Sequence, residues 1–299
     1  MVFIEKRIDM QKMHIGLFFR KIYKLPVWNY DGRMTRLHIL GTGNAQAVAC
    51  YNTCLCIENE EGFLLVDGGG GNGILGILEK KGIGLSSIHD IFITHIHADH
   101  ILGIIWMIRR IGETMIKGKM EGDLRIYCHR EAMDFLVSTC NAIIAGKVMK
   151  LVGDRIRFIL HEDGDERTII GNRFTFFDTG STKMKQFGFR MEYDGKVLVD
   201  AGDEPLSERN RHYARGADYL THEAFCLYED RDVFRPYEKH HSTARDAAIL
   251  AEELGVRNLI LYHTEDRTLQ SRKEKYGAEA RSVYSGNAIV PDDLETIEI

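Results

Sequence analysis

Short apolar runs separated by glycine-containing turns recur along the chain from Arg36 onward. Apolar runs of this length, bounded by turn residues, are typical of β-strands that are buried in a core. The pattern predicts strands at residues 36–40, 53–58, 62–67, 90–94, 124–128, 156–160, 173–177, 187–193, 196–200 and 257–262.

Helical spacing of apolar residues appears between several of these strands. It predicts helices at Gly73–Lys81, around Leu102–Arg110 and at 242–254. The last is the clearest, because Ser242 can cap its start and Gly255 follows its end. Strands and helices that alternate in this way favour two packed sheets with outer helices over a purely parallel sheet.

Length and composition indicate a soluble globular protein. The chain has 299 residues, of which 44% are hydrophobic and 28% are charged, so it can bury a large core. Residues 1–34 lack periodicity and are interpreted as an N-terminal extension, and residues 35–299 as one catalytic domain. The net charge of −5 gives no overall basic signature of nucleic-acid binding.

Cysteine use and hydropathy predict a cytoplasmic location. The six cysteines form no CxxC pair and are interpreted as free thiols in a reducing compartment. No apolar run approaches the roughly 18 residues of a membrane span, or the roughly 7–15 residues of a signal-peptide core. We therefore expect no membrane partner, and a homodimer is left open.

The segment THIHADH, Thr94–His100, carries the strongest chemical signal. It places three imidazoles and one carboxylate within six residues, directly after a buried strand. His95 and His97 share one side of an extended chain, and a turn after them would bring Asp99 and His100 to a second position. Such a loop can serve two metal ions about 3.5–4 Å apart. Imidazole and carboxylate ligands suit zinc, and manganese and iron are also compatible.

One loop cannot complete two coordination shells, so distant strand ends must supply further ligands. His263 ends the run NLILYH and is one candidate. Asp203, in LVDAGDEP, also follows a hydrophobic strand and could bridge two metals, and Asp200 is its rival. A strand-end histidine alone is more often structural, but the nearby cluster reverses that preference.

Taken together, these motifs resemble those of the metallo-β-lactamase superfamily, and within it the ribonuclease Z branch. The likeness runs from about Leu37 to Arg267. It is carried by the segments LHILGTGNAQ, FLLVDGGGG, IFITHIHADHILGI, LVDAGDEP, ADYLTHEAF and KHHSTARDAAILAEELGVRNLILYHT. The resemblance implies an αββα sandwich of two mixed β-sheets flanked by helices.

The resemblance also implies the metal ligands. His95 and His97 would bind the first metal ion, and Asp99, His100 and His263 the second. The glycine alignment selects Asp203, rather than Asp200, as the bridge between them.

Two residues receive catalytic roles by the same resemblance, and the proposed metal-bound water suggests a third. His241 would contact the scissile phosphate, Glu223 would orient His241, and Asp99 would hold or deprotonate the attacking water. The structural alternative is that His240 and His241 only cap the start of a helix. Phe225 stands where the family has threonine in its His-Glu-Ala-Thr segment.

The chain departs from the ribonuclease Z pattern at the first metal. The family has another histidine before the segment FGFR, where this chain has Thr182. The nearest upstream histidine is His161. We therefore expect a first site that is weak or empty, or that is completed by Asp178 or water.

A second departure concerns RNA. Ribonuclease Z enzymes usually carry a flexible arm that grips tRNA, whereas FGFRMEYDGKVLVD leaves room only for a hairpin turn at Asp194-Gly195. RNA binding relies on cationic contacts to phosphates, so the missing arm and the acidic balance argue against a tRNA-processing role. Lys183, Lys185 and Arg190 could bind a phosphate or simply form a solvated strand face.

We therefore expect a metal-dependent hydrolase that uses a metal-activated water, most specifically a phosphodiesterase of small-molecule or nucleotide phosphodiesters. RNA is an allowed but less favoured substrate. The enzymatic alternatives are a tRNA 3′-endonuclease and an ester, thioester or lactone hydrolase, because a fold does not select a chemistry. The non-enzymatic alternative is a metal-binding sensor or scaffold with a degenerate first site.

Overall fold

The computed structural model describes residues 34–299, and Met34–Ile299 form one compact unit. The predicted extension at residues 1–34 lies, except for Met34, outside the described residues.

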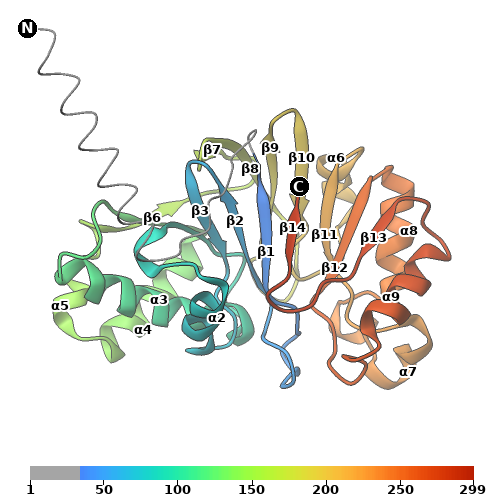
Figure 1. The fold of residues 1–299 in the computed structure, drawn as a ribbon, viewed down its shortest axis with the longest axis horizontal. Coiled ribbons are helices and arrows are strands. Elements are labelled where there is room, and N and C mark those ends of the chain that lie inside the picture. Colours follow the sequence, from blue (N-terminus) through green and yellow to red (C-terminus); the bar gives the residue numbers. More distant parts are fainter. Residues whose placement is uncertain (1–33) are drawn as a thin grey trace, which may run out of the picture. The chain divides into compact units, whose positions relative to one another are not determined.

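Two seven-stranded sheets face each other (Figure 1). The first has the order β14 (Thr296–Glu298), β1 (Arg36–Gly41), β2 (Cys54–Asn59), β3 (Gly62–Val66), β4 (Ile88–Phe92), β5 (Leu124–Cys128), β6 (Ile156–Leu160). The second has the order β13 (Asn287–Ile289), β12 (Asn258–Tyr262), β11 (Tyr219–Glu223), β10 (Lys196–Asp200), β9 (Phe187–Tyr193), β8 (Asn172–Asp178), β7 (Glu166–Ile169). Both combine antiparallel and parallel pairs, which confirms the expected mixed sheets.

Helices flank both sheets, which completes the expected αββα sandwich (Figure 1). Beside the first sheet lie α2 (Gly73–Lys81), α3 (Ala98–Ile116), α4 (Arg130–Ile143) and α5 (Gly146–Met149). Beside the second lie α6 (Arg211–Ala214), α7 (Arg231–Phe234), α8 (Ala244–Leu254) and α9 (Arg272–Arg281). Short 3-10 turns are η1 (Leu85–Ser87), η2 (Glu208–Asn210), η3 (Tyr228–Asp230) and η4 (Tyr237–Lys239). Within residues 34–299, no helix has the length and apolarity needed to span a bilayer.

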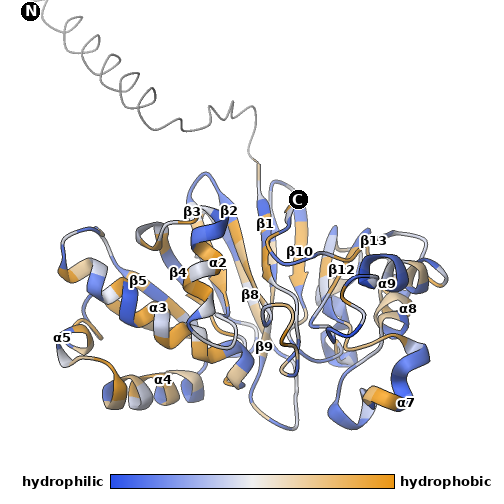
Figure 2. Cartoon of the chain, turned by 60° about the horizontal axis from the view of Figure 1, so that its bottom comes forward, coloured by the Kyte–Doolittle hydropathy of each residue, from blue (hydrophilic) through white to orange (hydrophobic). Residues whose placement is uncertain are grey.

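An aromatic core fills the space between the sheets. Phe92 from the first sheet stacks on Phe176 from the second, with ring centroids 5.2 Å apart. Both side chains are fully buried, as are Phe174 and Phe189. Alternate residues along each strand point to this layer, and Figure 2 shows hydrophobic residues concentrated on the strands and on one side of α3.

Glycines let α3 lie directly against the loop that follows β3. A Cβ on Gly103 would lie 1.8 Å from the carbonyl oxygen of Gly68, so no other residue fits there without movement. Backbone hydrogen bonds run from Gly68 N to His100 O and from Gly103 N to Gly69 O, both 2.9 Å long. These contacts fix the first turn of α3, which carries Asp99 and His100.

Two helix starts differ from the prediction. α3 begins at Ala98 rather than near Leu102, so Asp99 lies within its first turn. α8 is capped by Thr243, not Ser242, and Thr243 forms a reciprocal capping box with Asp246. The hydroxyl of Ser242 is directed elsewhere, since it donates a hydrogen bond to the carbonyl oxygen of Glu223 at 3.3 Å.

Candidate metal centre

The six predicted metal ligands converge at one edge of the two sheets. His95, His97, Asp99 and His100 lie between the end of β4 and the first turn of α3, Asp203 follows β10, and His263 follows β12. His263 Nε2 lies 2.7 Å from Asp203 Oδ1 and 3.5 Å from Asp99 Oδ2. His95 Nε2 lies 3.4 Å from Asp203 Oδ2. Segments more than 160 residues apart therefore meet at one point, as the sequence predicts.

Two sets of donor atoms form within this cluster, each with all its atoms within 4.8 Å of one another. One consists of His95, His97 and Asp203, and the other of Asp99, His100 and His263. His100 Nε2 is buried and has no hydrogen-bond partner among the described residues. Buried donor atoms without partners are costly unless a ligand satisfies them. Nitrogen and carboxylate oxygen are ligands of zinc and related ions, so these residues fit divalent cations.

The buried carboxylates and imidazoles of the cluster shift each other's pKa values in opposite directions. Burial alone would raise the pKa of Asp203, but the adjacent imidazole of His263, with those of His95 and His97 nearby, holds it well below the usual value. Burial lowers the pKa of His263, but the carboxylates of Asp203 and Asp99 outweigh it and raise the pKa to about 10. His100 is likewise buried, and Asp99 and Asp67 raise its pKa to about 9. Without cations, two imidazoles therefore carry protons that a metal ion would have to displace.

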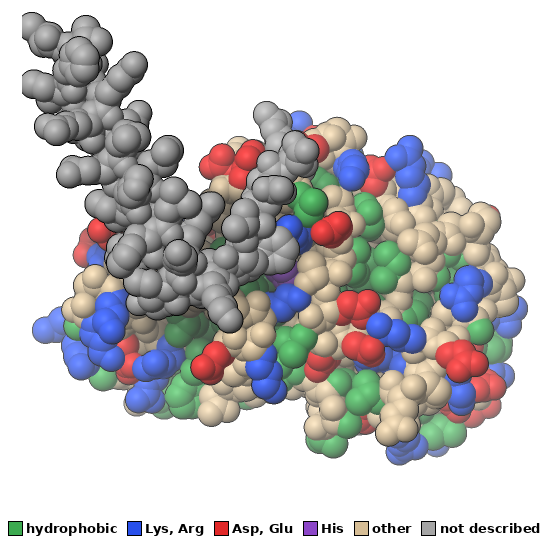
Figure 3. Space-filling model, viewed as in Figure 1, with side chains coloured by type: hydrophobic (Ala, Val, Ile, Leu, Met, Phe, Trp, Pro, Cys, Tyr) green, Lys and Arg blue, Asp and Glu red, His purple; other side chains and the backbone are tan. Residues whose placement is uncertain are grey.

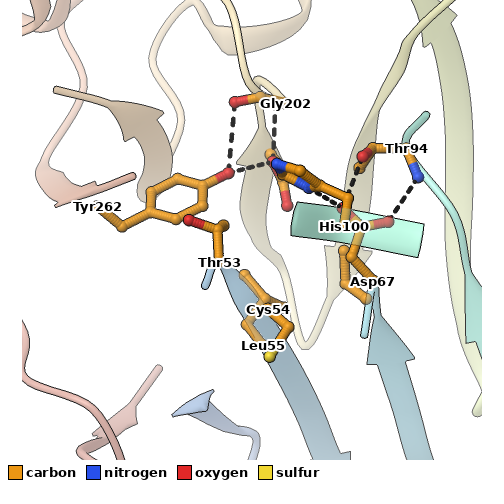
Figure 4. A pocket seen from close by; sticks show the side chains of 10 residues that line it. Thr53, Cys54, Leu55, Asp67, Thr94, His100, Gly202 and Tyr262 are labelled. Carbon is orange, nitrogen blue, oxygen red and sulfur yellow. Dashed lines mark hydrogen bonds and ion pairs between the residues drawn. The ribbon is translucent and has the colours of Figure 1, made fainter. Parts of the chain in front are cut away.

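Asp67, to which the sequence analysis gave no role, orients the second donor set (Figure 4). It accepts hydrogen bonds from His100 Nδ1 at 2.7 Å, from Thr94 N at 2.9 Å and from Thr94 Oγ1 at 2.6 Å. A proton held on Nδ1 leaves Nε2 of His100 available as a ligand. Asp67 has φ of +56°, a left-handed conformation that is uncommon for non-glycine residues but that Asp adopts more readily than most. The available signal was a carboxylate at the end of the strand FLLVD, followed by glycines.

Asp200 lies beside the cluster but belongs to none of the donor sets found within residues 34–299. Its carboxylate accepts hydrogen bonds from Gly202 N at 2.8 Å and from Tyr262 OH at 3.0 Å. Burial raises its pKa to about 6. The structure therefore brings Asp203, rather than its rival, to the other candidate ligands.

The expected gap in the first donor set is visible. Neither His161 nor Asp178 joins His95 and His97 in a donor set within the described part of the chain. The ring of His161 stacks on that of Phe176 at 4.3 Å, and Asp178 pairs with the ammonium of Lys185 at 3.1 Å. Three protein groups are thus available to the first position. The second has three of its own, and Asp203 also lies 2.7 Å from His263 Nε2 and 3.7 Å from His100 Nε2.

His241 and Glu223 lie beside the second donor set. Glu223 is fully buried, and its Oε2 lies 3.6 Å from His241 Nδ1, while its Oε1 accepts from Ser242 N at 2.6 Å. The ring of Phe225 stacks on the imidazole at 4.7 Å and 15°. His241 also forms a donor set with Asp203 and His263, so it is placed either to contact a substrate or to bind a cation.

Comparison with known proteins assigns the chain to a family. The profile of the family described as anti-Pycsar protein Apyc1 matches residues 35–280, most of the chain. The chain belongs to this family. Among curated proteins it is similar to ribonuclease Z of Myxococcus xanthus, with 27% identity over 89% of this chain and 98% of the relative. It is also similar to ribonuclease Z of Natronomonas pharaonis, with 25% identity over 88% and 97%.

Solved structures share the fold of this family member. The metallo-β-lactamase fold protein YhfI of Bacillus subtilis has a TM-score of 0.73 and 19% identity, over 89% of this chain and all of that one. The short form of human tRNase Z has a TM-score of 0.66 and 20% identity, over 88% and 98%. The predicted superfamily and the likeness to ribonuclease Z are confirmed, and the Apyc1 family is a more specific assignment than the sequence motifs provided.

Proposed function

We propose that this protein is a metal-dependent phosphodiesterase that hydrolyses small nucleotide phosphodiesters in the cytoplasm. The observation that carries the proposal is the cluster of two adjacent donor sets, with His241 beside them. Asp203 of the first set lies 2.7 Å from His263 Nε2 and 3.7 Å from His100 Nε2 of the second, so its carboxylate stands between them. This arrangement provides sites for two positive charges and a separate imidazole, which together suit a phosphodiester anion. The family's description as anti-Pycsar is compatible with such an activity.

In this proposal His95, His97 and Asp203 hold one cation, and Asp99, His100 and His263, with Asp203 shared, hold the other. Zinc fits the donors best, and manganese or iron would also be accepted. Bound cations supply positive charge that offsets charge on phosphate oxygens and acidifies water. Asp99, whose pKa stays below its usual value because His100 and His263 outweigh its burial, remains a carboxylate and can orient that water.

His241 would act on the substrate itself. Glu223 and Phe225 hold its imidazole from two sides, which limits its rotation. When the imidazole is protonated, Nδ1 faces the carboxylate of Glu223 and Nε2 donates a hydrogen bond to a phosphate oxygen. Charge that develops on that oxygen would then be stabilised, and the same proton could pass to the leaving group.

The hairpin between β9 and β10 favours a small substrate over tRNA. β9 ends at Tyr193 and β10 begins at Lys196, so the connection within the described chain is a tight turn with no arm. Asp194 and Gly195 both have positive φ, as this turn requires. On the face of the molecule seen in Figure 3, Lys and Arg are mixed with Asp and Glu over the part formed by the second sheet and by α8 and α9. No basic track for an RNA backbone is seen on that part of the described surface.

A tRNA 3′-endonuclease is the second candidate, and the observation in its favour is the similarity to curated ribonuclease Z proteins. A panel of substrates decides between them. Zinc- or manganese-loaded full-length protein should hydrolyse bis(p-nitrophenyl) phosphate and linear or cyclic nucleotide phosphodiesters much faster than a tRNA precursor or a lactone. Faster cleavage of the tRNA precursor would support the endonuclease, and hydrolysis of the lactone alone would reject both.

The role of His241 has its own test. His241→Ala should lower kcat on the phosphodiester by about 10²–10⁴-fold, the usual contribution of a positioned acid or base, while metal content is unchanged. His240→Ala, at the adjacent position in the turn after η4, is the matched control. Loss of a metal equivalent in His241→Ala would instead assign His241 to the metal ligands.

A further inference from the structure

A groove of about 430 Å³ lies along α3. Its walls come from the loop before α2, from α3, and from the end of α4 and the residue after it. Its lining includes Gly70, Asn72, Leu102, Trp106, Arg109 and Ile143. The volume lies within the range of about 300–1,000 Å³ that is typical of small-molecule sites.

The groove begins beside the metal centre. A Cβ on Gly70 would lie 3.9 Å from the Cα of Asp99, so this residue of the groove wall is a close neighbour of the candidate ligand. Leu102, Trp106 and Arg109 follow Asp99 by three, seven and ten residues, so they lie on the same side of α3. At 1.5 Å per residue, Trp106 lies about 10 Å along the helix from Asp99. That is the scale of a nucleoside attached to a phosphate.

The lining suits a flat aromatic group. Trp106 is half-buried, and the guanidinium carbon of Arg109 lies 5.4 Å from the centroid of its ring. Trp and Arg are the side chains on which nucleobases stack. Leu102 and Ile143 are large apolar residues that remain 37% and 62% exposed, and Asn72 offers an exposed amide at the opposite wall. Apolar walls with a few polar groups are typical of ligand sites.

We propose that this groove binds the base of the nucleotide whose phosphodiester is held at the metal centre, with Trp106 as the stacking residue. This inference rests on the proposed function, because it locates part of the same substrate. It makes Trp106 a specificity-determining residue.

Two phosphodiesters with the same leaving group test the proposal in the metal-loaded full chain: thymidine 5′-(p-nitrophenyl phosphate) and methyl p-nitrophenyl phosphate. Trp106→Ala should lower the ratio of kcat/KM for the nucleotide ester to that for the methyl ester by about 5- to 150-fold, the range expected when base stacking is lost. Most of the change should be in KM. Trp106→Phe should keep most of the ratio. Ile116→Ala, an exposed residue of α3 outside the groove, should leave it unchanged. Equal losses on both esters would overturn the proposal.

A binding measurement separates failure of this proposal from failure of the proposed function. The chain has two tryptophans, Trp28 and Trp106, so in Trp28→Phe protein the fluorescence reports on the groove. Thymidine monophosphate should quench it saturably, whether or not any ester is hydrolysed, and ribose phosphate should not. Absence of quenching would overturn the proposal. If quenching were absent and Ile143→Asp halved the molecular mass measured by sedimentation, the groove would instead be a surface covered by a second copy of the chain.

Discussion

Replacement of Asp67 by asparagine tests how the second metal position is oriented. The carboxylate accepts a hydrogen bond from His100 Nδ1 at 2.7 Å. When the imidazole loses one proton on cation binding, the remaining proton therefore stays on Nδ1 and Nε2 is the ligand atom. An amide NH2 group facing Nδ1 would favour the opposite tautomer and place the proton on Nε2. Asparagine tolerates positive φ well, so the φ of +56° at this position adds no new strain.

The expected effect follows from the bond that is lost. A hydrogen bond to a charged group contributes about 1.5–3 kcal/mol, which corresponds to about a 10- to 150-fold change in a binding constant. Loss of an outer partner of a metal ligand typically costs about 10–100-fold in affinity. We expect Asp67→Asn to raise the Kd of the tighter cation by about 10–100-fold, as measured by competition with a zinc chelator.

Asp90→Asn is the matched control, because Asp90 is an equally buried carboxylate that pairs with Arg125 away from the cluster. It should reduce stability without changing the affinity for the cation. If folded Asp67→Asn bound the tighter cation as strongly as Asp90→Asn did, the orientation argument would be refuted.

Three further predictions concern the metal-free protein and its packing. At pH 7.5 binding of the tighter cation should release about two protons, because His100 and His263, with pKa values of about 9 and 10, must each lose one to become ligands. The heat of binding measured by calorimetry should therefore depend on the ionisation enthalpy of the buffer. Equal heats in different buffers would contradict this. The two cations should bind with unequal affinity, because the first position has fewer protein ligands within reach than the second. Two equally tight sites in a chelator titration would show that another group of the protein completes the first position. Gly103→Ala should lower the free energy of unfolding, measured in urea, by about 1–3 kcal/mol, because the new Cβ would clash with Gly68 O. Gly76→Ala in α2 is the control and should not destabilise, because its Cβ would have no atom within 4 Å. An equal loss of stability in both variants would count against the packing argument.

The sequence predicted several strands closely because each is a short, largely apolar run between turn residues. β5, β6, β9 and β10 have the predicted bounds. β11 was missed because its sequence, YLTHE, carries polar groups that are buried for the site, so its hydrophobic pattern is interrupted. β14, with only three residues, forms because it pairs with β1 at the other end of the chain. Such pairing at long range leaves no local signal.

For the candidate site, spacing and strand ends pointed to five of the six predicted ligands, and the resemblance to a known family chose Asp203 over Asp200. Neither revealed the surroundings of these residues. Asp67 and Phe225 act through contacts with His100 and His241 that only the folded chain reveals. The groove along α3 was also hidden, because its apolar residues have the spacing of an ordinary buried helix face. The sequence therefore shows the ligands more readily than it shows the groups that position them.

The most direct test of the central claim is phosphodiester turnover in protein that has been stripped of metal and then reloaded. Turnover of bis(p-nitrophenyl) phosphate should be absent from the stripped protein and return with zinc or manganese, and it should continue to rise after the tighter site is full. In Asp203→Asn, which removes the carboxylate that lies between the two donor sets, added metal should restore little activity. Full turnover by the stripped protein, or by folded Asp203→Asn, would contradict the account.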